Sequence, residues 1–262
     1  MSYIEVKNLN KDYQRKSANG SIETVQVLSD VTFNIEKGEF VCLLGFSGCG
    51  KSTLLNLMAG FEKPTSGSVV IDGKEVANPS PKYITIFQHY GLLPWKTVQK
   101  NVEFGLERTV KDKSERAAIA QQYLELVGLK DYMGQFPAQL SGGQQQRVAI
   151  ARSLAVNPDI LFMDEPFGAL DPIIRNKLQD DLLKIVKEQQ KTVIFVTHDI
   201  EEAVYLADRI FVMKANPGHI EKEYEVKMLR PRLRNVSGFG EYRKAIYNKL
   251  FSIQENVVEY II

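Results

Sequence analysis

The sequence has few of the features that mark secreted or membrane-spanning chains. Its 262 residues include only two cysteines, Cys42 and Cys49, without CxxC spacing, so we expect no disulfide framework and a reducing, cytosolic setting. No uncharged apolar run approaches the ~20 residues that cross a bilayer. The first residues, MSYIEVKNLNKDY, carry charges where a signal peptide needs its apolar core. We therefore expect a chain that does not span the membrane.

The chain also lacks an excess of charge of either sign. Lys and Arg number 33 against 32 for Asp and Glu, which leaves a formal net charge of +1. That balance gives no general attraction to nucleic acid or anionic lipid, and we expect no nucleic-acid partner. The content of 44% hydrophobic and 25% charged residues is that of a globular protein with a large core.

Short apolar, β-branched stretches alternate with helix-like stretches along most of the chain. This alternation predicts an α/β fold with a parallel core. The expected strands are 3–6, 24–35, 40–44, 68–71, 83–87, 160–163, 193–197 and 210–213, and the expected helices of this framework are 51–59, 172–188 and 199–206. Between Val98 and Leu154 the sequence instead predicts helices alone, at 98–106, at 114–127 and from Ser141 onward. A further helix is expected at 241–258.

A glycine-rich turn follows the apolar strand 40–44 and precedes a helix, and it fits the pattern GxxxxGK[ST]. Glycines let successive backbone N–H groups converge on phosphate oxygens at a helix N-terminus. Lys51 is expected to reach the β- and γ-phosphates, and the Ser52 hydroxyl to hold Mg²⁺. A turn that binds nothing is the competing interpretation, and Cys49 is read as a tolerated small residue rather than a redox sensor. The expected nucleotide contacts are Gly45, Phe46, Ser47, Gly48, Cys49, Gly50, Lys51, Ser52 and Thr53.

Two acids follow another apolar strand, Ile160-Leu161-Phe162-Met163-Asp164-Glu165. They emerge at its carboxyl end, where open α/β sheets bind their ligands. Asp164 is suited to assist Mg²⁺, and Glu165 to polarise an attacking water. Beside the glycine-rich turn, this pair predicts a P-loop nucleotidase.

A second glycine-containing helix start, Leu140-Ser141-Gly142-Gly143-Gln144 followed by Gln145-Gln146-Arg147, resembles the signature sequence of ABC ATPases. Ser141 is a natural N-cap, and the helix terminus favours an anion. The resemblance implies that two such domains dock head to tail, either as a homodimer or with a paired ATPase subunit. In that arrangement Ser141, Gly142, Gly143 and Gln144 cap ATP held by the partner.

Further positions match the same family in order along the chain. Gln88 resembles the glutamine that touches Mg²⁺ and senses the γ-phosphate, and Gly168-Ala169-Leu170-Asp171 resembles the loop that crosses the dimer interface. His198 matches the histidine that grips the γ-phosphate, which makes Glu165, His198 and Gln88 the expected catalytic residues. Tyr13 matches the aromatic that stacks on adenine, although it could also be a core residue. Phe46 is a departure, because many relatives carry proline there.

The resemblance implies a P-loop NTPase core with a mixed sheet, made of N-terminal antiparallel strands and a parallel core, and an inserted α-helical subdomain. The expected single ABC ATPase domain has its core at 1–90 and 156–225, its helical subdomain at 91–155 and a helical tail at 226–262. The expected ligands are ATP and Mg²⁺.

Leu92-Leu93-Pro94-Trp95, the run Phe167–Pro172 and Arg230-Pro231-Arg232 resemble importer ATPases for nitrate, sulfonates, taurine or bicarbonate. This likeness implies a transport-coupled ATPase on the cytoplasmic face of the membrane, partnered by separate permease subunits and indirectly by a solute-binding protein. Trp95 would contact the permease, unless it belongs to the domain's own core. An exporter ATPase, a non-transport ABC ATPase and a nucleotide-dependent switch stay open as alternatives.

Overall fold

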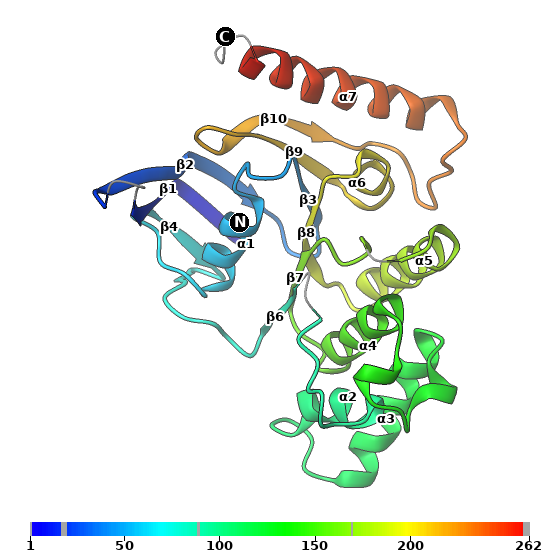
Figure 1. Ribbon diagram of the computed structural model, residues 1–262. Helices are drawn as coiled ribbons and strands as arrows, with labels where there is room; N and C mark the ends of the chain where they lie inside the picture. Colours follow the sequence, from blue (N-terminus) through cyan, green and yellow to red (C-terminus); the bar gives the residue numbers. More distant parts are fainter. Residues whose placement is uncertain (1, 17–19, 88–89, 169, 259–262) are drawn as a thin grey trace. The chain divides into compact units, whose positions relative to one another are not determined.

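The computed structural model describes residues 2–16, 20–87, 90–168 and 170–258, the last seven of these by their backbone alone (Figure 1). The backbone packs into two compact units. The first comprises the chain up to Ser80 and from Thr192 onward, and the second is Pro81–Lys191. The predicted division into core, helical block and tail follows motifs rather than backbone packing, and it stays a prediction.

The first unit contains an antiparallel sheet with the strand order β2-β1-β4-β5. Its strands are β1 (Ile4–Lys16), β2 (Ile22–Ile35), β4 (Ser66–Ile71) and β5 (Lys74–Glu75). The strand β1 is far longer than the predicted 3–6, because it pairs with β2 through Lys16 opposite Ile22. Residues 13–16 of β1 are exposed, so backbone pairing extends the ribbon where no buried face marks it in the sequence.

The same unit holds a parallel trio of strands. In it β3 (Phe40–Leu44) pairs with β8 (Thr192–Thr197) on one side and with β9 (Arg209–Lys214) on the other, and β10 (His219–Glu225) adds an antiparallel edge. Every residue of β3 and β8 is buried, as expected of strands covered on both faces. The helix α1 (Lys51–Ala59) packs on β8, and α6 (Ile200–Leu206) packs on β3 and β8. The predicted mixture of antiparallel and parallel pairing is confirmed.

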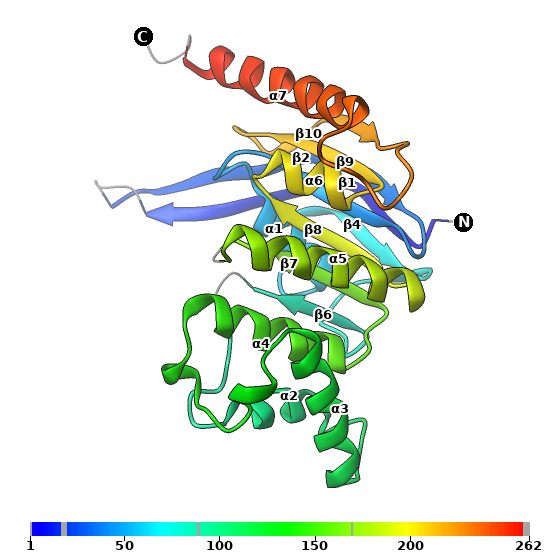
Figure 2. The ribbon, with the colours of Figure 1, turned by 90° about the vertical axis from the view of Figure 1, so that its right-hand side faces the viewer.

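The second unit pairs β6 (Tyr83–Ile86) with β7 (Ile160–Asp164) in parallel. Between these strands in the chain lie α2 (Val98–Leu106), α3 (Lys113–Leu126) and α4 (Gly142–Ala155), which pack on one another (Figure 2). Two short 3-10 turns, Lys130–Tyr132 and Pro137–Gln139, connect α3 to α4, and α5 (Pro172–Glu188) follows β7. The predicted insertion of a helical block is confirmed.

A strap of residues 226–236 leads from β10 to the last helix of the first unit, α7 (Ser237–Val258). The helix begins four residues before the predicted 241–258. It packs on α6 and β9, with Phe239, Ile246 and Leu250 buried. None of the described helices combines the length and apolar character needed to cross a membrane.

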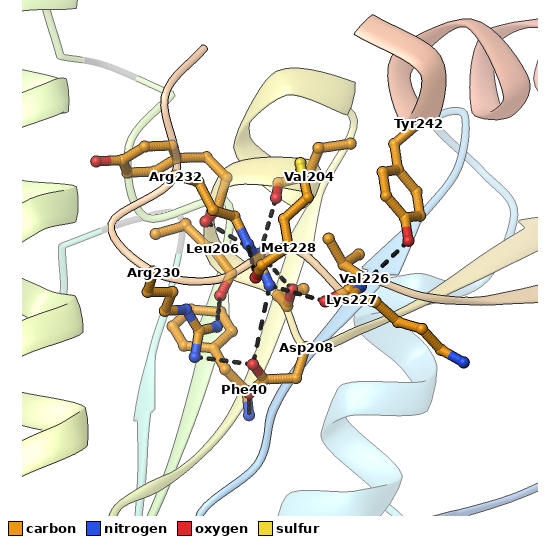
Figure 3. Close-up of polar contacts among 12 residues, drawn as sticks. Phe40, Val204, Leu206, Asp208, Val226, Lys227, Met228, Arg230, Arg232 and Tyr242 are labelled. Carbon is orange, nitrogen blue, oxygen red and sulfur yellow. Dashed lines mark hydrogen bonds and ion pairs between the residues drawn. The ribbon is translucent and has the colours of Figure 1, made fainter. Parts of the chain in front are cut away.

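Arg232 fastens the strap to the body of the first unit (Figure 3). Its side chain is only 4% exposed, and burial, with Arg230 nearby, lowers the pKa of its guanidinium to about 10, which leaves it charged at neutral pH. The guanidinium donates to backbone carbonyls at the end of α6 and in the strap itself. The acceptors are Val204, Tyr205, Ala207, Val226 and Met228. The last turn of a helix leaves such carbonyls without intrahelical donors, so Arg232 acts as a cap for α6.

Asp208 ties the same strap to the central strand. Its carboxylate lies 2.8 Å from the guanidinium of Arg230 and accepts a hydrogen bond of 2.9 Å from the backbone N–H of Phe40, the first residue of β3. The strap, the end of α6 and the start of β3 are therefore joined in one polar network, which Figure 3 shows.

We expect Arg232→Met to destabilise the protein by about 3 kcal/mol, because several buried carbonyls lose their donor while the apolar bulk is kept. For a chain of this size the melting temperature should fall by roughly 6–12 °C, measured by differential scanning calorimetry. Arg243→Met is the matched control, since it breaks only an exposed pair with Glu201 and should cost less than about 1 kcal/mol. Equal losses in the two variants would contradict the capping role.

Candidate nucleotide-binding site

The glycine-rich loop between β3 and α1 is packed so closely at Gly45 and Gly50 that a side chain would not fit at either position. A Cβ on Gly45 would lie 2.7 Å from the Cys49 Sγ and 2.8 Å from the Met213 carbonyl oxygen. Gly50, the N-cap of α1, has φ of 91°, and a Cβ there would lie 2.6 Å from the Leu28 Cδ2. The loop is thus held against β2 and β9 in a conformation that L-residues with side chains avoid.

Lys51 places its ammonium inside this loop. The Nζ donates to the carbonyl oxygens of Gly45, at 2.7 Å, and of Phe46, at 3.0 Å, and the residue is 5% exposed. The positive charge therefore lies beside the N-terminus of α1, whose free N–H groups also favour an anion. Ser47, Gly48 and Ser52 are exposed on the same loop. The arrangement suits a polyphosphate that approaches from solvent.

Cys49 is buried in the loop, and burial raises the pKa of its thiol. A thiol with a raised pKa holds little thiolate and reacts slowly. This favours the interpretation of Cys49 as a tolerated small residue over that of a redox sensor.

Two other predicted residues lie in the first unit with the loop. His198 follows β8 directly and is exposed. Because β8 is the parallel neighbour of β3, His198 emerges at the same sheet edge as the phosphate loop. His219, by contrast, directs its Nδ1 to the Pro217 carbonyl oxygen at 2.9 Å, a local contact at the start of β10.

Tyr13 lies on β1 with its hydroxyl hydrogen-bonded to the carboxylate of Glu62. Burial and that hydrogen bond raise the pKa of Tyr13 to about 12. The ammonium of Lys11 lies 4.7 Å from the ring centroid and 3.3 Å from the Glu62 carboxylate. Sequence reasoning missed Glu62, which has no motif around it and meets Tyr13 only in the fold. The stacking of Tyr13 on adenine stays a prediction.

In the second unit, Asp164 ends β7, and Glu165 follows it with φ of 46°. A non-glycine residue in this left-handed region is strained, and such residues gather at functional sites. Both acids are half-buried. Asp164 and Ser52 are each oxygen donors of the kind that Mg²⁺ prefers, so the residue types fit the expected metal.

The segment that begins at Ser141 and resembles the ABC signature lines a pocket of about 350 Å³ within the second unit. Ser141 caps α4, since its Oγ accepts from the Gln144 N–H at 3.3 Å. Asp171 caps α5 in the same way, with its carboxylate 3.0 Å from the Ile174 nitrogen. Two helix N-termini from separate motifs therefore meet at one cavity. Its lining residues are Ser141, Gly142, Gly143, Arg147, Leu170, Asp171 and Ile174.

Arg147 adds a full positive charge to the pocket, and it was absent from the predicted contacts. Burial lowers the pKa of this guanidinium, while the nearby Asp171 opposes the shift. Its spacing of four residues from Gly143 could have suggested a place on the same side of α4. The Gln144 side chain is turned back, and its Oε1 accepts from the Ser141 N–H at 2.8 Å. Gln88, predicted to be catalytic, and Ala169 lie outside the described residues.

The α/β sheet, the phosphate loop with its internal lysine, and the acids after β7 define a P-loop NTPase. A family model described as "ABC transporter" matches residues 28–168. The chain belongs to the ABC transporter family, as an ATP-binding member with ATPase activity coupled to transport.

The curated relatives agree with this membership. An uncharacterized ABC transporter ATP-binding protein of Methanocaldococcus jannaschii is 48% identical over 94% of this chain and 91% of its own. The aliphatic sulfonates import ATP-binding protein of Bacillus cereus is 43% identical over 93% of this chain and 94% of its own. Nitrate import and bicarbonate transport ATP-binding proteins of Synechocystis are each 44% identical, over 86% and 89% of this chain and 83% and 82% of their own.

A solved structure supports the fold. The dimeric post-hydrolysis state of the ATP-binding cassette MJ0796, bound to ADP and Pi, matches with a TM-score of 0.78 and 37% identity. The match covers 86% of this chain and 100% of that chain. The predicted P-loop NTPase fold is confirmed.

We expect Lys51→Ala to weaken ATP binding at least about tenfold and to abolish hydrolysis, because the loop loses its charge-assisted hydrogen bonds to the β- and γ-phosphates. Titration calorimetry and a phosphate-release assay measure the two effects. Lys63→Ala, which removes an exposed lysine of the same unit, should leave both unchanged. Near wild-type turnover in purified Lys51→Ala would contradict the assignment of this loop as the site of the β- and γ-phosphates.

Proposed function

We propose that this chain is the ATP-hydrolysing subunit of an importer and that two copies dock head to tail around two ATP molecules. The observation that carries the proposal is the cavity of about 350 Å³ where two helix N-termini and Arg147 meet. A chain with a phosphate loop already has one anion site, so a second needs another phosphate. The partner's nucleotide supplies it, with Ser141 and Gly142 facing the γ-phosphate held by the other Lys51. The dimeric state of the solved relative supports this arrangement.

In this proposal the residues divide the chemistry of hydrolysis among them. Lys51 and the loop N–H groups neutralise the β- and γ-phosphates, and Glu165 accepts the proton of the attacking water. His198 and Gln88 orient the γ-phosphate. When bound by Ser52, Gln88 and Asp164, Mg²⁺ supplies charge stabilisation at the phosphate oxygens. The pocket at Ser141 of the second copy completes the enclosure of the ATP, so hydrolysis requires the second copy.

Trp95 is the proposed contact with the separate permease subunits. It is 71% exposed, which excludes the alternative that it belongs to the core. The turn that carries it is rigid, because the fully buried side chain of Asn101 binds backbone groups of Leu93, Lys96 and Thr97. A rigidly presented tryptophan suits a groove contact with a partner helix.

The names of the relatives support uptake of a small anion of the nitrate, sulfonate or bicarbonate type, and the taurine type rests on the sequence resemblance alone. The solute-binding protein would act through the permease, and the chain would work at the cytoplasmic face of the membrane. The solute itself would never touch this subunit.

We expect Glu165→Gln to bind ATP normally but to hydrolyse it ~10²–10⁴ times more slowly, since the amide keeps the shape and lacks the base. If closure needs both nucleotides and opening needs their cleavage, this variant accumulates as an ATP-bound dimer. Size-exclusion chromatography with light scattering, with and without ATP, measures the dimer. Glu188→Gln, an exposed acid of the same unit, is the control and should behave as wild type.

Adding Ser141→Arg to Glu165→Gln should leave ATP binding by the monomer intact and prevent the dimer. A Glu165→Gln protein that binds ATP yet stays monomeric at saturation would contradict the shared site. Hydrolysis at the wild-type rate would instead show that another group, His198 first, positions the water.

We expect Trp95→Ala to reduce co-purification with the permease roughly 30-fold, as loss of an aromatic anchor of about 2 kcal/mol does. The ATPase rate of the isolated chain should not change. Phe136→Ala, another exposed aromatic of the second unit, is the control. Unchanged assembly and solute uptake in Trp95→Ala would rule out this contact surface.

A further inference from the structure

The C-terminal helix α7 reaches the phosphate loop through an aromatic cluster. The Phe251 ring meets the Phe46 ring edge-on, with centroids 6.1 Å apart and an interplanar angle of 85°. Tyr247, one turn earlier, lies against Phe251 with centroids 4.0 Å apart. The edge-to-face contact of Phe46 with Phe251 is one of the favoured geometries of aromatic pairs, and the tilted ring of Tyr247 packs beside it. Two features without a role so far, the unusual Phe46 and the tail helix, therefore meet at one place.

The helix presents these rings from a fixed position. On its inner side Ile246 and Leu250 are buried at 0% and 4% exposure. Lys249 forms an ion pair of 2.5 Å with Glu221 on β10. Tyr247, Leu250 and Phe251 follow helical spacing, so docking of the helix core also aims the aromatic side chains. The position of Phe251 beside the loop is set by the packing of the whole helix.

Phe46 connects this contact to the Lys51 ammonium in the glycine-rich phosphate loop, which is called the phosphate cradle below. Its carbonyl oxygen accepts one of the two hydrogen bonds that the Lys51 ammonium donates to loop carbonyls, at 3.0 Å. Phe46 is 37% exposed, so the contact with Phe251 restrains a residue that solvent reaches. The neighbouring Gly45 cannot shift freely, because Met213 and Cys49 enclose it. Rotation of residue 46 would therefore turn the carbonyl away from the lysine.

We propose that Tyr247 and Phe251 are positioning residues for the phosphate cradle. They hold the Phe46 ring, which fixes the Phe46 carbonyl, and this carbonyl directs the Lys51 ammonium toward the phosphates. The inference rests on the proposed function of the loop in holding ATP. Without the cluster, ATP binding has to order the loop itself, and the cost appears as weaker affinity. The chemical step should be spared, because none of the three rings touches the reacting atoms.

The experiment compares Phe251→Leu, Phe251→Tyr and Phe46→Leu in the full chain. ATP affinity is measured by titration calorimetry, KM and kcat by phosphate release, and melting temperature by calorimetry without nucleotide. Phe251→Leu should weaken ATP affinity about threefold to tenfold and raise KM by the same factor, with kcat within about twofold of wild type. Phe251→Tyr should restore the affinity. Asn248→Ala, on the exposed side of the same turn, should change nothing.

The double variant Phe46→Leu/Phe251→Leu should bind ATP no more weakly than the worse single variant, since both changes remove one contact. Multiplied effects would overturn the proposed route through Phe46. Leu250→Ala serves as a structural comparison, because it loosens the helix core. The comparison is between the rise in KM and the fall in melting temperature. If Phe251→Leu raises KM only in proportion to its loss of melting temperature, as Leu250→Ala does, the aromatic cluster merely supports the fold and the proposal fails.

Failure of this inference and failure of the proposed function give different results. Unchanged ATP affinity in Phe251→Leu, together with lost affinity in Lys51→Ala, overturns the positioning role and leaves the cradle assigned. Unchanged affinity in Lys51→Ala would remove the cradle assignment itself.

Discussion

The close approach of the backbone around the phosphate loop is the constraint on which the first unit depends. A Cβ on Gly218 would lie 2.4 Å from the Cys49 carbonyl oxygen, just as one on Gly50 would strike Leu28. The turn between β9 and β10 and the strand β2 thus form walls on the loop. These walls confine Gly45 and Gly50 on either side of the loop, where the Lys51 ammonium donates to two carbonyl oxygens. The fully buried strands β3 and β8 supply the rigid base that such a confined loop needs.

The arrangement of charges and helix N-termini in the pocket of the second unit is complementary to an anion. The caps formed by Ser141 and Asp171 satisfy some helix N–H groups and leave others directed at the pocket. Arg147 adds its guanidinium there, and Asp171 opposes the lowering of its pKa by burial. A cavity so built favours an anion. In the proposed arrangement the second copy supplies that anion, because the phosphate loop of the same chain is expected to hold its own nucleotide.

The sequence predicted what local patterns encode and missed what distant residues create. The loop, the cap at Ser141 and the helical block depend on neighbouring residues, and each was found at its expected place. The partnership of Tyr13 with Glu62 and the interior position of Arg232 depend on segments more than twenty residues apart, and the length of β1 depends on its pairing with β2. The left-handed conformation of Glu165 is likewise imposed by the fold. Arg230, Arg232 and Arg234 lie close together around a proline and a leucine, a pattern that suggests a solvated surface. Nothing in the neighbouring residues indicates that Arg232 is buried.

The tail is fastened to the first unit through two contacts of very different strength. Loss of the buried Arg232 network should cost about 3 kcal/mol, whereas an aromatic pair is worth about 0.5–1.5 kcal/mol beyond its burial. The strap therefore decides whether α7 is docked at all, and the cluster of Phe46, Tyr247 and Phe251 decides how firmly the loop is held once it is. Arg232 also caps α6, the helix that follows His198. The tail therefore supports both the loop that carries Lys51 and the helix that follows His198. It is in this way part of the framework of the ATP site.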